Sequence, residues 1–326
     1  MTALVIGGAG YVGSHVVHAL LDRGEPVVVV DDLSSGHRET VPAAAHFVQA
    51  DMADSVRMAR VCAEHAVDAA LCFAGKIEVG ESVKDPRRHW RTNVGGTVAL
   101  LEGLLDARVP HFVFSSTAAV YGTPEVVPIP DDATERPTNP YGATKLAVER
   151  MLGAYADAYP LAYTALRYFN AAGADPARGL GERHDPETHL IPNAIRAALG
   201  LRGPLEVFGD DWPTPDGTCV RDYVHVSDLA DAHVLALAAL RRGECPRAMN
   251  LGSTAGSSVN EVIGTVEHLS GKVVPRRYVA RRPGDPAVLV AASARATTAL
   301  GWQPSRSTLD RIVGDALAWH ANPLAR

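Results

Sequence analysis

Short apolar runs alternate with longer amphipathic segments through the first half of the chain. The clearest run is the four valines at positions 27–30, whose lack of polar alternation predicts a strand covered on both faces of a parallel sheet. Similar runs predict strands over residues 4–6, 47–48, 68–73, 111–115 and 163–169, and the amphipathic stretch 11–23 predicts a helix. This βαβα alternation predicts the α/β class with a doubly wound parallel sheet of Rossmann type.

The pattern changes after Phe169. Residues 170–186, 209–217 and 281–286 are rich in glycine, proline and aspartate, which predicts loops. The elements between them are short and do not continue the alternation. We therefore expect a smaller, loop-rich C-terminal lobe. The expected domain boundaries are 1–170 with about 219–252 and 287–300 for the sheet domain, and about 171–218 and 253–286 with the C-terminal helix for the lobe.

The composition argues against several functional classes. Lys and Arg number 31 and Asp and Glu 37 among 326 residues, which gives a net charge of −6. Such a chain has no electrostatic footprint for nucleic acid or for an anionic membrane. No stretch approaches the roughly 18 consecutive apolar residues of a membrane span. The N-terminus lacks the charged leader of a signal peptide.

The cysteines and histidines predict neither disulfides nor a metal site. None of the four cysteines is in C-x-x-C spacing, and a chain of this length folds without cross-links. We therefore expect free thiols in a reducing cytoplasm. His184, His189 and His225 are scattered too widely in the sequence to be proposed as ligands of one ion.

A glycine-rich loop follows the first predicted strand. Gly7, Gly10 and Gly13 are spaced G-x-x-G-x-x-G at the start of the predicted helix. Glycine lets the backbone approach a pyrophosphate, and the helix N-terminus then offers free N–H groups to the anion. The next strand ends in Asp31, 18 positions after Gly13. A carboxylate there accepts hydrogen bonds from a ribose 2′-OH and repels a 2′-phosphate, which favours NAD over NADP.

Tyr141 and Lys145 are four positions apart and so share one face of a helix. A phenol has a pKa near 10, but a nearby ammonium and an oxidised nicotinamide favour its phenolate. Such a pair beside NAD can take a proton from a sugar hydroxyl near neutral pH. Thr117 ends an apolar strand 24 residues before Tyr141 and can bind the same substrate oxygen.

Together these elements resemble the extended short-chain dehydrogenase/reductase family, and within it the epimerases that act at C4 of UDP-glucose and UDP-galactose. The resemblance covers essentially the whole chain. The segments that carry it are GGAGYVGSH (7–15), VGESV (79–83), FSSTAAVYG (114–122), NPYGATKLAVE (139–149), LRYFNAAGA (166–174), DGTCVRDYVHVSDLADAH (216–233) and RRPGDPA (281–287). The last two are more specific than the glycine-rich loop, because most other dehydrogenases of this class lack them.

The resemblance implies an NAD-dependent 4-epimerase of a UDP-hexose that works through a transient 4-keto sugar. Tyr141 would remove the proton of the sugar 4-OH while the C4 hydride passes to NAD, which stays bound because each cycle regenerates it. Lys145 would hold the nicotinamide ribose and lower the pKa of Tyr141, and Thr117 occupies the family's Ser/Thr position. Related 4,6-dehydratases carry an acidic pair after this threonine, whereas this chain has Ala118 and Ala119. Simple epimerisation is therefore favoured.

The resemblance also implies two sets of binding residues. Those expected to hold NAD, besides Gly7, Gly10, Gly13 and Asp31, are Tyr11, Val12, Asp51, Met52, Phe73, Ala74, Gly75, Asn93, Ser115, Tyr141, Lys145 and Tyr168. Those expected to hold the UDP-sugar in the C-terminal lobe or at its edge are Thr117, Tyr141, Asn170, His189, Leu190, Phe208, Arg221, Arg282 and Asp285. The arginines suit this role because a guanidinium holds phosphate oxygens in a bidentate fork.

Some departures from the family pattern leave the sugar open. Lys76 directly follows Gly75, where relatives often place the lysine one position later, and His189 stands where asparagine is common. Leu289 falls near the position whose side chain determines in relatives whether bulky N-acetyl sugars can bind. A side chain of intermediate size there does not distinguish between the two classes of sugar. UDP-glucuronate and UDP-N-acetylhexosamines thus remain alternative substrates. A catalytically silent sensor of NAD or nucleotide sugar is an alternative of another class.

Two apolar helical faces bear on the oligomeric state. Such stripes more often pack within one subunit, but the resemblance implies a homodimer built on a four-helix contact. The two faces include Val94, Val98, Leu101 and Leu105, and Leu146, Met151, Leu152 and Tyr155.

Overall fold

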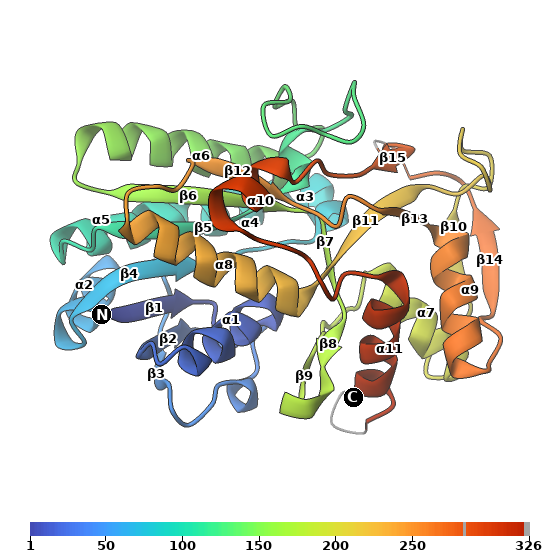
Figure 1. The fold of residues 1–326 in the computed structure, drawn as a ribbon, viewed down its shortest axis with the longest axis horizontal. Coiled ribbons are helices and arrows are strands. Elements are labelled where there is room, and N and C mark those ends of the chain that lie inside the picture. Colours follow the sequence, from blue (N-terminus) through green and yellow to red (C-terminus); the bar gives the residue numbers. More distant parts are fainter. Residues whose placement is uncertain (283–284, 323–326) are drawn as a thin grey trace.

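The computed structural model describes residues 1–282 and 285–322, and its main element is a seven-stranded parallel sheet (Figure 1). The strand order is β12-β6-β5-β4-β1-β2-β3. This order confirms the doubly wound α/β class. The strands are β1 (Thr2–Ile6), β2 (Val27–Asp31), β3 (His46–Gln49), β4 (Val67–Cys72), β5 (His111–Thr117), β6 (Ala162–Tyr168) and β12 (Ala248–Leu251).

The apolar runs account for six of these strands. All five residues of β2 are buried, as expected for a strand that helices cover on both sides. β12 is the strand that the pattern does not predict. It is a four-residue edge strand with an asparagine, Asn250, and it pairs with β6, in which Met249 lies opposite Leu166.

Helices cover both faces of the sheet. One face packs against α1 (Tyr11–Asp22), α8 (Val226–Arg241) and α10 (Ala294–Leu300). α1 confirms the helix predicted over residues 11–23. The other face packs against α2 (Ser55–Glu64), α5 (Thr97–Asp106) and α6 (Pro140–Ala158). Helices α3 (Val79–Lys84) and α4 (Pro86–His89) precede a π-helical segment, Trp90–Gly96, that continues into α5.

A smaller lobe lies to the right of the sheet in Figure 1. Its core packs α7 (Leu190–Ala198), α9 (Val259–Ser270) and α11 (Leu309–His320) together. Its strands are short and belong to small sheets. They are β7 (Asn170–Ala172), β8 (Ala174–Asp175), β9 (Leu180–Gly181), β10 (Leu205–Phe208), β11 (Val220–His225), β13 (Gly256–Ser258), β14 (Arg276–Val279) and β15 (Val288–Leu289). The domain boundaries remain a prediction, since β11 leads from this lobe straight into α8 on the large sheet.

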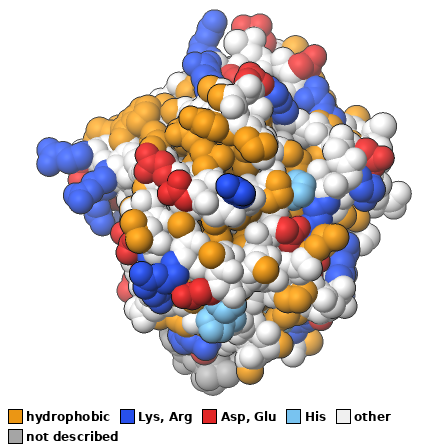
Figure 2. All heavy atoms as spheres, turned by 90° about the vertical axis from the view of Figure 1, so that its left-hand side faces the viewer, with side chains coloured by type: hydrophobic (Ala, Val, Ile, Leu, Met, Phe, Trp, Pro, Cys, Tyr) orange, Lys and Arg blue, Asp and Glu red, His pale blue; other side chains and the backbone are white. Residues whose placement is uncertain are grey.

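The apolar faces expected at a dimer contact are only partly free. Leu101, Leu146 and Leu152 are buried inside the subunit, and the other five side chains are partly buried. Hydrophobic side chains gather on the face shown in Figure 2, at the height of α5 and α6 in Figure 1.

In residues 1–282 and 285–322, no helix combines the length and the apolar character needed to cross a membrane.

Candidate functional site

The candidate site lies at the carboxyl edge of the sheet, where β1 and β4 are neighbours. The strand order reverses direction between them, so the loops that follow these two strands border a crevice. Gly7 directly follows β1 with a φ of +78°, and a Cβ there would lie 2.6 Å from the backbone nitrogen of Ala74 in the loop after β4. Only glycine meets both conditions, so the two loops can close on one another.

Helix α1 begins in this crevice with unpaired N–H groups. Its N-cap is Gly10, no side chain caps the first turn, and that turn holds no acidic residue. Gly13 lies in the same turn against the carbonyl of Gly7. The first backbone N–H groups, including those of Tyr11 and Val12, have no intrahelical acceptor and face outward as an anion site. This cradle fits the pyrophosphate of a dinucleotide.

Asp31 lies at the end of β2 beside the glycine loop and is buried. One carboxylate oxygen accepts a hydrogen bond from the Ala9 N–H at 3.0 Å and the other from the Leu33 N–H at 2.9 Å. Burial raises the pKa of Asp31, and these two hydrogen bonds oppose the rise. Because a carboxylate offers about four acceptor positions, room remains for the two hydroxyls of a ribose.

Tyr141 and Thr117 meet farther along the same edge. Thr117 ends β5, and its side chain is hydrogen-bonded to the phenol of Tyr141, the second residue of α6. Asn139 caps α6 by accepting a hydrogen bond from the Gly142 N–H at 2.9 Å. Ser82 of α3 accepts a hydrogen bond from the Tyr141 N–H at 3.2 Å. Ser82 and Asn139 therefore fix the backbone at the start of α6, and Thr117 contacts the phenol itself.

The electrostatics of this pair differ from the expectation. Burial raises the pKa of Tyr141 to about 12, the hydrogen bond with Thr117 lowers it, and the carboxylate of Glu78 raises it further. Burial also lowers the pKa of Lys145 to about 8. The ammonium of Lys145 donates a hydrogen bond to the carbonyl of Ser115 at 2.9 Å. Burial, and not Lys145, thus sets the pKa of Tyr141 in this structure.

Several residues expected to hold NAD surround Lys145. The hydroxyl of Ser115 is hydrogen-bonded to that of Tyr168, which ends β6. Gly75 follows Phe73 and Ala74 in the loop after β4, and a Cβ on it would lie 3.7 Å from the Lys145 ammonium. The structure therefore brings the loop after β4 and the carboxyl ends of β5 and β6 together around one buried cation.

Asn93, another residue expected to hold NAD, lies beside the loop after β4. Its side-chain oxygen accepts a hydrogen bond from the Lys76 N–H at 2.7 Å, and its amide donates to the Lys76 carbonyl at 3.0 Å and to the Thr144 hydroxyl at 3.1 Å. Asn93 thereby ties the loop after β4 to α6. After β3, Met52 is buried, while Asp51 is exposed and accepts a hydrogen bond from the Ala53 N–H at 2.9 Å.

Five residues expected on the substrate side lie in the smaller lobe although they are far apart in sequence. The guanidinium of Arg282 lies 4.3 Å from the ring centre of Phe208, at the end of β10. Asp285 pairs with Arg282 at 3.4 Å and with Arg221 of β11 at 3.8 Å. Asn170 of the adjacent strand β7 donates a hydrogen bond to the Asp222 carbonyl at 2.8 Å. The group offers two guanidinium ions and an aromatic face.

Leu190 begins α7, and His189, the N-cap of this helix, borders a cavity of about 680 Å³. Residues 33–37, Ile77 and Glu78, and 183–186 with Thr188 and His189 line this cavity. The sequence spacing predicts no shared site for His184 and His189, yet their rings lie 5.4 Å apart. His225 lies elsewhere, paired with Asp315 at 3.2 Å.

Sequence reasoning missed two residues that position Tyr141. One is Ser82, whose hydroxyl is fully buried beneath the Tyr141 N–H. The other is Gly142, where a Cβ would collide with the carbonyl of Ala119, so that α6 begins directly on the turn after Thr117. The segments VGESV and NPYGATKLAVE contain both residues, but only the packing reveals what they do.

Comparisons with known proteins agree with this geometry. Residues 3–252 match the NAD dependent epimerase/dehydratase family. The chain is 53% identical over 316 residues to the UDP-glucose 4-epimerase of Azospirillum brasilense, covering 97% of this chain and 91% of that protein. It superimposes on the UDP-glucose 4-epimerase from Brucella ovis in complex with NAD with a TM-score of 0.94, 47% identity and 97% coverage of both chains. The enzyme from Bifidobacterium longum in complex with NAD+ and UDP gives a TM-score of 0.92 at 36% identity, with 100% coverage of both chains.

Proposed function

The chain belongs to the NAD dependent epimerase/dehydratase family, and on this basis we propose that it is an NAD-dependent enzyme that inverts C4 of a UDP-hexose. UDP-glucose and UDP-galactose are the pair it interconverts. One observation carries the proposal: Tyr141 is hydrogen-bonded to Thr117 one helical turn from Lys145, at the sheet edge that also holds the glycine loop.

The residues of the crevice fit NAD. The uncapped first turn of α1 would bind the pyrophosphate, and Asp31 would bind the ribose that carries the adenine. Lys145 would border the nicotinamide ribose, together with Ser115, whose hydroxyl is hydrogen-bonded to that of Tyr168. When bound, NAD supplies the reversible two-electron oxidation of the sugar at C4.

Tyr141 is the base in this proposal. With a pKa of about 12 it is protonated at neutral pH, so it accepts the proton of the 4-OH only where positive charge stabilises its phenolate. Lys145 has a pKa of about 8 and keeps most of its positive charge at pH 7 on the same helical face. Thr117 donates or accepts a hydrogen bond at the same oxygen and so orients the transfer.

The turn after Thr117 supports epimerisation over elimination. Its side chains are those of Ala118 and Ala119, and Ala118 is buried. Neither can move a proton at C5 or C6 of the sugar. The reaction therefore ends with return of hydrogen to C4, and a bound 4-keto sugar that offers its other face gives the inverted configuration.

Arg221, Arg282 and Phe208 would hold the UDP portion. The two guanidinium groups lie within reach of one carboxylate, that of Asp285, so they converge on a space that a diphosphate can enter. The Phe208 ring offers an apolar face against which a uracil can stack.

We further propose a homodimer in the cytoplasm. The partly buried residues Val94, Val98, Leu105, Met151 and Tyr155 of the two apolar faces would meet their counterparts in a second copy. The four cysteines form no disulfide, which suits a reducing compartment. Sedimentation analysis tests the dimer: a monomer at micromolar concentration contradicts it.

Incubation of the purified protein with UDP-galactose tests the activity. Chromatography of the sugar nucleotides should show UDP-glucose, without added NAD, because the cofactor is regenerated in each cycle. UDP-glucuronate and UDP-N-acetylglucosamine, tried in parallel, report the breadth of the site. Tight NAD binding without conversion of any of these compounds contradicts the proposal. It favours the alternative function, a catalytically silent sensor of NAD or nucleotide sugar.

A further inference from the structure

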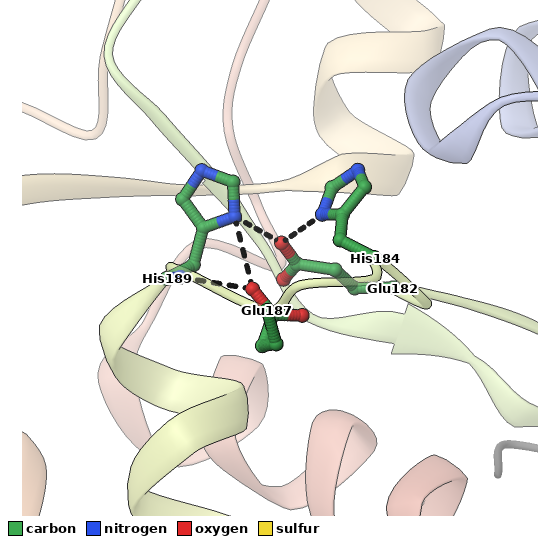
Figure 3. A group of neighbouring side chains, drawn as sticks. All are labelled: Glu182, His184, Glu187 and His189. Atoms are coloured by element: carbon green, nitrogen blue, oxygen red, sulfur yellow. Dashed lines mark hydrogen bonds and ion pairs between the residues drawn. The ribbon is translucent and has the colours of Figure 1, made fainter. Parts of the chain in front are cut away.

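Four potential metal ligands converge in the loop between β9 and α7 (Figure 3). They are Glu182, His184, Glu187 and His189, and one ligand atom from each lies within 4.8 Å of all the others. All four come from eight consecutive residues, so the loop folds around a single point. The cluster shares no residue with Tyr141, Lys145 or the three loop glycines. The ring centre of His184 lies 6.2 Å from that of Tyr11, and His189 is also one of the residues expected on the substrate side.

The contacts within the cluster are those of atoms aimed at a common centre. Nδ1 of His189 lies 2.5 Å from Oε1 of Glu182 and 3.4 Å from Oε1 of Glu187, and Nδ1 of His184 lies 3.1 Å from the same oxygen of Glu182. Figure 3 shows both imidazole rings turned toward the carboxylates. Nδ1 of His189 is shielded from solvent, and its only near neighbours in the cluster are these two carboxylate oxygens. One ring nitrogen therefore faces oxygens of both carboxylates, at the point where a bound ion would join them.

We propose that this cluster binds one zinc ion through the two imidazoles and the two carboxylates. Two carboxylates and two neutral imidazoles carry a charge of −2, which one divalent cation cancels. Imidazole nitrogen favours zinc over magnesium or calcium, and four ligands suit its tetrahedral preference. Zinc–ligand bonds of about 2.0–2.2 Å place tetrahedral ligand atoms roughly 3.3 Å apart. The ligand atoms now lie between 2.5 and 4.8 Å from one another, so the closest pair must separate slightly and the more distant pairs must approach.

The supports of the cluster are already in place. The carboxylate of Glu187 accepts hydrogen bonds from the N–H groups of Thr188 and His189, both at 2.8 Å. The indole of Trp319 in α11 donates to the Glu182 carbonyl at 3.1 Å. Such outer contacts fix the orientation of ligands before an ion arrives.

The ion would also have a route in. The side chains of His184 and His189 are 23% and 43% exposed, and both line the cavity of about 680 Å³, while those of Glu182 and Glu187 are 4% and 3% exposed. The carboxylates thus form the floor and the imidazoles the mouth of the site.

The place of the cluster indicates a structural role. Its loop contacts the sheet domain, where a ring nitrogen of His37 lies 3.1 Å from the Arg183 carbonyl, and it leads directly into α7. A bound zinc ion would hold this connection between the sheet domain and the smaller lobe in one conformation. We therefore expect zinc to stabilise the folded protein.

Zinc content and unfolding temperature test the proposal. Tag-free protein is stripped with a chelator, reloaded with zinc chloride, freed of excess metal and analysed by mass spectrometry of the metal. We expect about one zinc per chain and a rise in unfolding temperature that magnesium does not produce. Cobalt loading should give the intense visible absorption of tetrahedral Co²⁺ and not the weak absorption of octahedral Co²⁺.

Matched variants separate the cluster from its surroundings. His184→Asn and Glu187→Gln should each weaken zinc binding at least a hundredfold, while Asp185→Asn, an exposed acid in the same loop, should leave it unchanged. Unfolding curves of the metal-free variants show whether they are folded. Wild-type protein that takes up no more zinc than the His184→Asn/Glu187→Gln double variant overturns the proposal; His189 then carries a proton between the two carboxylates.

Discussion

Glu149 ties the helix that carries Tyr141 and Lys145 to the sheet. It lies one turn after Lys145 in α6, and its carboxylate accepts hydrogen bonds from Nε of Arg167 at 3.1 Å and from Nη2 of Arg167 at 2.5 Å. The hydroxyl of Ser116, which precedes Thr117 in β5, donates to the same carboxylate. Glu149→Gln removes the charge and keeps the shape.

The structure sets the size of the expected loss. The Glu149 and Arg167 side chains are only 7% and 5% exposed, and removal of one member of such a pair costs about 3–5 kcal/mol, because the other charge stays buried. Glu135 also pairs with Arg167 and remains in the variant. We therefore expect the lower figure, about 3 kcal/mol of unfolding free energy.

The loss should reach the active site as well. α6 is held against β5 and β6 by this pair, and a shift of about 1 Å in a catalytic group can lower a rate about a hundredfold. We expect kcat to fall at least tenfold, with a small change in KM, because the residues proposed to grip the UDP portion lie in the other lobe.

Urea unfolding and steady-state kinetics provide the assay. Glu102→Gln, an exposed acid on α5, is the control and should change the unfolding free energy by less than about 0.5 kcal/mol. The Glu149→Gln/Arg167→Met double variant should lose at least about 1 kcal/mol less than the two single variants combined, since the residues are coupled. Additive losses, or a loss below about 1 kcal/mol for Glu149→Gln, would refute the reasoning.

Three further predictions concern the crevice. Tyr141→Phe should lower kcat by about a hundredfold to ten-thousandfold with nucleotide binding nearly unchanged, whereas Tyr159→Phe at the exposed end of α6 should be neutral; normal turnover in Tyr141→Phe contradicts the assignment of the base. Asp31→Ala should release bound NAD, with affinity weakened tenfold to a hundredfold by the loss of charged hydrogen bonds; unchanged cofactor content after gel filtration argues against the ribose contact. The pKa of Lys145 is about 8 in the folded protein and 10.5 ordinarily. Between pH 8 and 10.5 the unfolded chain therefore binds more protons at this residue than the folded protein does. The free energy of unfolding contributed by Lys145 rises with pH over that range. Urea unfolding measures the difference in unfolding free energy between the wild-type protein and Lys145→Met. This difference should shift in favour of the wild-type protein by up to about 3 kcal/mol between pH 8 and 10.5. A difference that does not change with pH contradicts a buried charge at Lys145.

The sequence predicts the sheet well because its strands are buried on both faces. The four valines of β2 form an uninterrupted apolar run. The strand can therefore be recognised without knowing which strand it pairs with or in what register. β12 is different, since its four residues form a strand only through the pairing of Met249 with Leu166. The glycine loop and Asp31 are predictable for a related reason: parallel strands end at one edge, so residues after successive strands must meet.

The other contacts depend on the tertiary fold. Nothing in the sequence places Phe208 against Arg282, because strand β10 and the segment after β14 become neighbours only when these strands pair. The burial that raises the pKa of Tyr141 is likewise a property of the packed site. Glu182 and His189 belong to an irregular loop, and neither helical nor strand periodicity could have predicted that their side chains converge.

The most direct test of the account follows the hydrogen at C4. The protein is incubated with UDP-galactose in D2O, and the sugar nucleotides are analysed by proton NMR. If Tyr141 exchanges a proton with the hydroxyl while the carbon-bound hydrogen leaves and returns through a cofactor that stays in place, UDP-glucose will form with its C4 hydrogen retained as protium. Deuterium at C4, or no UDP-glucose at all, would contradict the account.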